Sequence, residues 1–159
     1  MLRRVRTRAF LLVAVAAAFD LGCGDRAMAH LPPITTSSPT VQVSELPAPH
    51  GKGKDTSEKT FGSFDQEAHW GSLNGAISVS VAPQDLNGPT SNVTLDVGQG
   101  RVRLYLQDGK GYRYIEATPG NPAQTRGDLM YAGGSWWYTL EAVDGEAKGI
   151  TAHVWRRNK

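Results

Sequence analysis

The fold is decided by residues 133–157, which read GGSWWYTLEAVDGEAKGITAHVWRR. Two runs rich in β-branched and aromatic residues flank Asp144 to Lys148, a short segment of turn-forming residues. Strand, turn and strand are therefore encoded locally. The stretch predicts a β-hairpin in which Val143 pairs with Gly149 across the turn.

The two faces of this predicted hairpin differ in composition. Because side chains alternate along a strand, Trp136 and Tyr138 share one face, which is expected to lie in the core. The opposite face places Trp137 beside Trp155, with His153 next along the strand. Such an indole pair has two interpretations: a cross-strand contact that stabilises the sheet, or an exposed aromatic platform for a ligand.

The N-terminal sequence predicts export from the cytoplasm. Four arginines lead into the apolar run Ala9 to Phe19, and small residues occupy the cleavage positions at Ala27 to Ala29. We therefore expect residues 1–29 to be a signal peptide. An apolar run of this length is too short for a membrane span, which needs about 20 residues.

Cys23 is the only cysteine of the chain and follows the apolar run. Leu21 to Cys23 is similar to a bacterial lipobox, in which the cysteine would carry a lipid, although Asp20 stands where that motif has a large aliphatic residue. We expect a periplasmic or secreted protein, with a lipoprotein anchored at Cys23 as the alternative.

Residues 30–60 are rich in Pro, Ser, Thr, Gly and Lys, a composition that predicts a disordered linker before a domain at 61–159. Removing residues 1–29 takes away five arginines and two aspartates, which leaves 12 basic and 13 acidic residues. This balance gives no argument for a nucleic-acid partner.

The remainder of the chain predicts a series of strands. Apolar residues alternate in Ala76 to Ala82, in Asn92 to Val97 and in Arg101 to Gln107. Residues 61–71 fit a helical turn or a loop, and 118–127 form the longest expected loop. The fold class is therefore all-β, a small antiparallel barrel or sandwich of six to seven strands.

Two short turns set the expected neighbours of the third strand. Gly98 to Gly100 would join it to the second strand and place Asp96 opposite Arg103. Asp108-Gly109 is a strong hairpin signal and would pair Gln107 with Lys110. The outer face would then gather a second aromatic cluster, made of Arg103, Tyr105, Tyr112 and Tyr114. Exposed arginines over tyrosines are also common decoration of a sheet.

No stretch has the pattern of a catalytic, metal or cofactor site. Asp65, Glu67 and His69 alternate as divalent-ion ligands would, but no second ligand cluster accompanies them, so they are interpreted as polar surface residues. We expect no metal and no cofactor. The chain also lacks a glycine-flanked nucleophile and a phosphate-binding loop, so no catalytic residues are assigned.

The sequence therefore predicts an exported, non-catalytic envelope module that binds a glycan, a peptidoglycan strand or a protein partner through outward aromatic residues. A structural or accessory subunit of an envelope complex is the alternative, and a hydrolase is less favoured. The candidate ligand-binding residues are Trp137, Trp155, His153, Tyr105, Tyr112, Tyr114 and Arg103.

Overall fold

The computed structural model of this protein describes residues 33–61, 65–81 and 90–156. These residues form nine strands and no helix, which confirms the all-β fold class. No helix in these three ranges is long and apolar enough to cross a membrane. The strands are β1 (Val41–Val43), β2 (Lys52–Thr60), β3 (Asp65–Val81), β4 (Thr90–Gln99), β5 (Val102–Asp108), β6 (Gly111–Ala117), β7 (Ala123–Asp128), β8 (Met130–Ala132) and β9 (Ser135–Trp155).

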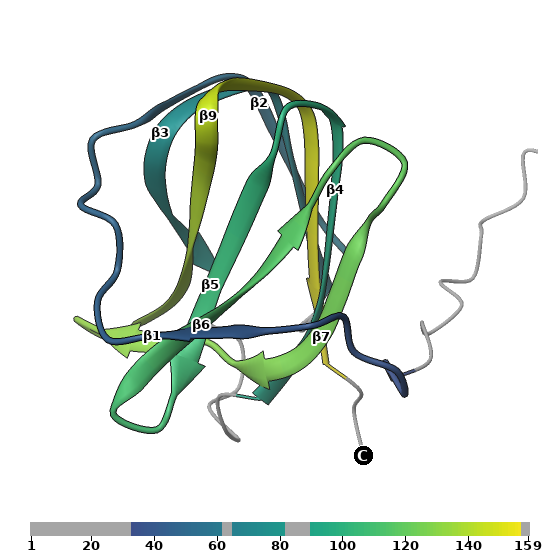
Figure 1. Cartoon of the computed structure of the whole chain (residues 1–159). Coiled ribbons are helices and arrows are strands. Elements are labelled where there is room, and N and C mark those ends of the chain that lie inside the picture. The colour runs from purple at the N-terminus through teal and green to yellow at the C-terminus, as the bar shows by residue number, and fades with distance from the viewer. Residues whose placement is uncertain (1–32, 62–64, 82–89, 157–159) are drawn as a thin grey trace, which may run out of the picture.

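The strands close into a small barrel with extra strands at its edges (Figure 1). The second half of β9 pairs with β4, β4 with β7, β7 with β5, and β5 with the first half of β9. The contact between β7 and β5 is the single pair Gln107 and Asp128. Strands β6 and β1 extend the sheet beyond β5, and β3 and β2 extend it beyond β9.

The hairpin predicted for residues 133–157 is wrong, because Ser135–Trp155 forms one continuous strand, β9. Strand β3 runs antiparallel to it along both halves. Trp137 pairs with Ser80, whereas Trp155 pairs with Asp65 at the other end of β3. The two tryptophans therefore lie at opposite ends of one strand and not side by side.

The turn-forming residues bend β9 instead of reversing it. The register between β3 and β9 shifts after Asn74, and residues 143–145 have no partner in β3. Gly75 and Gly145 on the two strands have φ angles of 72° and 102°, which glycine adopts without steric cost. Bulges of this kind bend a strand. Figure 1 shows β9 rising along one side of the barrel, bending over the top and descending on the other side.

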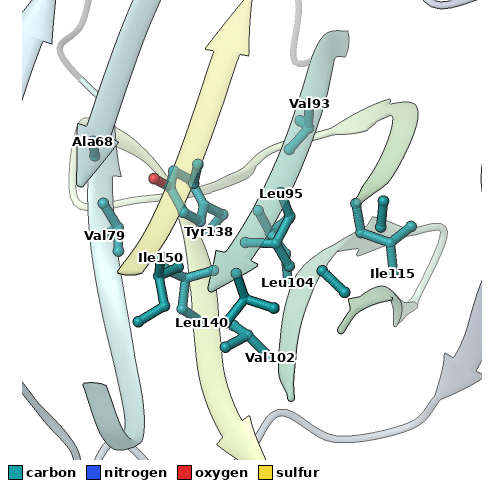
Figure 2. Packing of buried hydrophobic residues seen from close by; sticks show 14 of the residues in the cluster. Ala68, Val79, Val93, Leu95, Val102, Leu104, Ile115, Tyr138, Leu140 and Ile150 are labelled. Carbon is teal, nitrogen blue, oxygen red and sulfur yellow. The ribbon is translucent and has the colours of Figure 1, made fainter. Parts of the chain in front are cut away.

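The apolar core fills the barrel interior. The inward faces predicted for 92–97 and 101–107 are confirmed, since their alternate residues are buried. Leu104 on β5 and Leu140 on β9 are cross-strand neighbours and are both fully buried. Figure 2 shows side chains from several strands converging, among them Ala68, Val79, Val93, Leu95, Val102, Leu104, Ile115, Tyr138, Leu140 and Ile150.

Two predicted pairings differ from the structure. Strand β4 pairs with β7 and β9 and not with β5, so Asp96 does not face Arg103. In the hairpin of β5 and β6, Asp108 pairs with Gly111, so the turn lies at Gly109-Lys110. This shifts the register by two residues. The predicted faces are kept, because a shift of two preserves the alternation of side chains.

The segment that the sequence assigned to a disordered linker contributes two edge strands. β1 pairs with β6, and β2 pairs with β3 from Lys52 to Thr60. Nearly all residues of β2 are exposed. The segment is therefore ordered by backbone hydrogen bonds to β3, because its own side chains are not buried. Composition alone does not detect such an edge strand. The predicted signal peptide and Cys23 lie outside the described residues.

Two further segments were assigned wrongly from the sequence. Residues 65–71 are part of β3 and form neither a helical turn nor a loop. The expected loop at 118–127 contains a tight turn from Thr118 to Asn121, and β7 begins at Ala123.

Candidate functional site

The residues of the second predicted cluster share one face of β5 and β6, but Tyr105 is only 4% exposed, so the expectation that it is displayed to solvent is wrong. Tyr105 pairs with Tyr114, and their ring centroids lie 5.2 Å apart. The guanidinium of Arg103 lies 4.5 Å from the centroid of Tyr114. The pairing of Gln107 with Lys110 predicted from the sequence would have placed Arg103 opposite Tyr114, but the shifted register places Glu116 there. Tyr112 is only half exposed and packs against the core.

The polar groups of this cluster are bonded to side chains of the neighbouring strands. Nε of Arg103 donates to the Glu116 carboxylate at 2.8 Å, and the Tyr105 hydroxyl donates to Glu141. Burial and the hydrogen bond to Glu141 raise the pKa of Tyr105. Arg101 adds an ion pair to Asp144 at 2.9 Å. Because its charged groups are paired with one another, the cluster offers few groups to a ligand and stabilises the seam between β5, β6 and β9.

The residues predicted around Trp155 are also brought together, but the indole is not exposed. Only 6% of Trp155 is accessible, and its buried Nε1 has no hydrogen-bond partner in the structure. His153 packs against it with ring centroids 4.9 Å apart and forms a hydrogen bond to Asp65. The expectation of an outward Trp155 platform is therefore wrong.

The remaining predicted tryptophan, Trp137, is half buried against the core, and its partner on β8 is Met130. Its neighbour Trp136 shares the inward face of Tyr138, as the alternation predicts. Trp136 is nonetheless only half buried, because β9 begins at Ser135 and the barrel interior ends there.

An unpredicted cluster surrounds Trp136, near the start of β9, and includes Arg156, which directly follows the end of that strand. We call Tyr131, Trp136 and Arg156 the end cluster. The rings of Tyr131 and Trp136 are tilted by 45° with centroids 4.6 Å apart. The guanidinium of Arg156 lies over the Trp136 ring, 5.4 Å from its centroid. Tyr131 is 54% exposed.

Arg156 is held firmly in the end cluster. Its Nε donates to the hydroxyl of Ser91 at 2.8 Å. Burial lowers the pKa of the guanidinium, and the nearby carboxylate of Asp128 opposes this shift. The guanidinium remains charged at any physiological pH, because the ordinary pKa of arginine is above about 12. The cluster thus combines two aromatic rings with a positioned cation.

The sequence contained a signal for this cluster. Gly133 and Gly134 have positive φ angles of 60° and 82°, and Ala132 pairs with Ser135 across them. A Gly-Gly pair between apolar residues is a recognised two-residue hairpin signal. This turn places Tyr131 opposite Trp136. The proximity of Arg156 had no local signal, because it depends on the bend of β9.

The alternating acidic and histidine residues of 65–69 lie on strand β3. No group of three or more His, Cys, Asp or Glu side chains among the residues that the structure describes is arranged to hold a metal ion. Asp65, Glu67 and His69 lie on one strand, where Asp65 bonds His153 and His69 contacts Thr151.

Comparison with known proteins gives no family. No family model matches the chain, and no curated protein matches it. A transcriptional regulator of the HTH_3 family from Vibrio cholerae is similar over 60% of this chain at 12% identity and a TM-score of 0.38, and the chain spans 45% of that regulator.

Two further solved structures show the same weak similarity. A Cupin_2 domain of an XRE family regulator from Enterobacter cloacae aligns with 67% of this chain and 100% of its own at 9% identity and a TM-score of 0.40. A family 29 carbohydrate binding module in complex with mannohexaose aligns with 74% of this chain and 88% of its own at 11% identity and a TM-score of 0.34. Similarity of this degree carries no argument about ligand or activity.

Proposed function

We propose that this protein is an exported, non-catalytic module that binds a glycan through the end cluster. The observation that carries the proposal is the exposed ring of Tyr131 packed against the half-buried Trp136, with the Arg156 guanidinium beside it. Export rests on the predicted signal peptide at residues 1–29.

The chemistry of the end cluster suits a sugar. Aromatic rings provide a large, rigid contact surface at low entropic cost, and the apolar face of a pyranose ring can pack on them. A guanidinium donates several hydrogen bonds in fixed directions, which suits hydroxyl or carboxylate groups at the edge of such a ring. Rings that lie at 45° to each other would contact two neighbouring faces of a ligand and not one flat surface.

A binding assay with matched variants tests this function. Purified protein is incubated with a panel of insoluble polysaccharides and with purified peptidoglycan, and the retained fraction is measured. Tyr131→Ala and Trp136→Ala should each weaken retention about tenfold or more, as loss of an aromatic hot spot does. Val41→Ala is the control, because Val41 is 48% exposed but lies on β1.

Thermal melts of each variant separate loss of binding from loss of fold. Tyr131→Ala should melt close to the parent, since Tyr131 is 54% exposed and lies outside the buried core. Equal retention of all variants would show that the end cluster does not bind the glycan. Retention only on an envelope protein and on no glycan would favour the accessory-subunit alternative.

A further inference from the structure

We propose that a second ligand site lies on the outer face of β2 and β3 and binds a small zwitterion, a molecule with both an ammonium and a carboxylate group. The site is a cavity of about 260 Å³ lined by Ser57, Lys59, Glu67 and His69. We call it the β2–β3 groove. It shares no lining residue with the end cluster.

The register of β2 and β3 places two cross-strand pairs of residues along the groove. Ser57 pairs with His69, and Lys59 pairs with Glu67. Directly opposite residues project from the same face of a sheet, and residues two positions apart on one strand do so as well. Four polar side chains therefore surround one cavity.

The two charged residues of the groove form no ion pair with each other. Lys59 and Glu67 are nevertheless cross-strand partners. In the part of the chain that the structure describes, neither side chain has another hydrogen-bond or ion-pair partner. His153 pairs with Glu67 on the β9 side but directs its imidazole to Asp65. A cation and an anion thus line the same cavity.

His69 is fixed in a defined orientation at the edge of the groove. Its Nδ1 lies 3.2 Å from the hydroxyl oxygen of Thr151 on β9. This contact holds the ring and leaves Nε2 available to a ligand. The hydroxyl of Ser57, opposite His69, offers both a donor and an acceptor.

This combination of groups selects a ligand of both charges. An ammonium group would bind Glu67, and a carboxylate would bind Lys59. A ligand with one charge would gain one of these contacts and be repelled by the other residue, and a neutral sugar would use neither charge. The cavity volume equals that of about eight to nine water molecules, at roughly 30 Å³ each, which is enough for a small amino acid.

Titration with three small probes tests the proposal. Alanine supplies both charges, propionate supplies the carboxylate alone, and ethylamine supplies the ammonium alone. The uniformly ¹⁵N-labelled protein is titrated with each probe, and chemical shifts of backbone amides in β2 and β3 are followed. We expect saturable shifts around Lys59 and Glu67 with alanine, and binding at least about tenfold weaker with the two other probes.

Variants locate the site and separate it from the end cluster. Lys59→Met and Glu67→Gln should each weaken alanine binding about tenfold or more. Lys54→Met is the matched control, because Lys54 lies on the same strand but does not line the cavity. Trp136→Ala should leave alanine binding unchanged, so failure of the glycan proposal would not affect this one.

Three outcomes would overturn the proposal: no saturable shifts with alanine, equal binding of alanine and propionate, or equal loss of binding in Lys54→Met and Lys59→Met.

Discussion

Two glycines at positive φ have different surroundings. Gly100 has a φ of 87°, and a Cβ atom there would lie 3.0 Å from the Cα of Ala147 on β9. Gly109 has a φ of 58° in the turn between β5 and β6, where a Cβ atom would meet nothing within 4 Å. The first glycine is required by both conformation and close approach, and the second by conformation alone.

We therefore predict that Gly100→Ala destabilises the protein more than Gly109→Ala. The second change should cost about 1 kcal/mol, the ordinary penalty of a left-handed backbone for a residue with a side chain. The first should cost about 1 to 3 kcal/mol more, because the neighbouring backbone must shift. Urea denaturation of both variants measures the difference. Equal urea midpoints for the two variants would show that the backbone of β9 at Ala147 can move away from the new side chain without a cost in stability.

A buried tyrosine, Tyr138, is expected to lower the stability of the folded protein at alkaline pH. Burial raises the pKa of Tyr138 well above its ordinary value, and the charge of Glu58 adds to this shift. The folded state therefore favours the protonated phenol. Stability from this group is fully present below about pH 10, the ordinary pKa, and is lost as the pH rises further.

We predict that Tyr138→Phe reduces the loss of stability between about pH 10 and pH 12. Each buried tyrosine should contribute a slope of about 1.4 kcal/mol per pH unit in this range. Tyr105, whose pKa is also raised, should keep part of the slope in the variant. Denaturation curves at several pH values measure it. An unchanged slope would show that the Tyr138 phenol ionises without unfolding.

At the level of strands, the sequence predicted which face of each strand is buried better than it predicted which strands pair with each other. Alternation correctly placed Leu104 and Leu140 in the core, because period two depends only on the backbone. It could not reveal that Asp144 to Lys148 would bend one strand, since the same residue types serve turns and bulges. What decides between them is β3, whose length allows it to pair with β9 on both sides of the bend.

The same limit applies to the candidate site. Arg103, Tyr105 and Tyr114 were correctly gathered on one face, since alternation is local and the register differs from the predicted one by two residues. The Tyr131 and Trp136 contact was also within reach of local turn chemistry. Arg156 was not, because its place beside Trp136 results from the path of the whole strand.

The strands differ in how deeply they are embedded, which predicts their hydrogen exchange. β2 is an edge strand with exposed side chains, whereas the second half of β9 lies between β3 and β4. Amides of β9 at 150–154 should exchange with the slowest rates, which report global unfolding. Amides of β2 should exchange much faster through local opening. Equal protection in both would show that β2 is an integral part of the cooperative unit.

For the molecule as a whole, closure of the barrel depends on the contact of β5 with β9. Leu104 and Leu140 meet there, both fully buried. We predict that Leu104→Ala costs about 2 to 5 kcal/mol, the usual range for a buried leucine. Calorimetry should show one transition at a lower temperature. Two separate transitions would mean that the seam joins two units that fold independently.

The bent strand β9 also determines when the barrel can fold during synthesis of the chain. A chain synthesised as far as Gly134 contains β3, β4 and β5 but lacks the strand that pairs with all three. The barrel therefore cannot close until β9 has left the ribosome, and residues as distant as Asp65 and Trp155 must then meet. Pairing between such distant segments is slow, with folding times of about milliseconds to seconds in comparable β-proteins. The nascent chain is thus open until β9 has emerged, a state that a chaperone can bind.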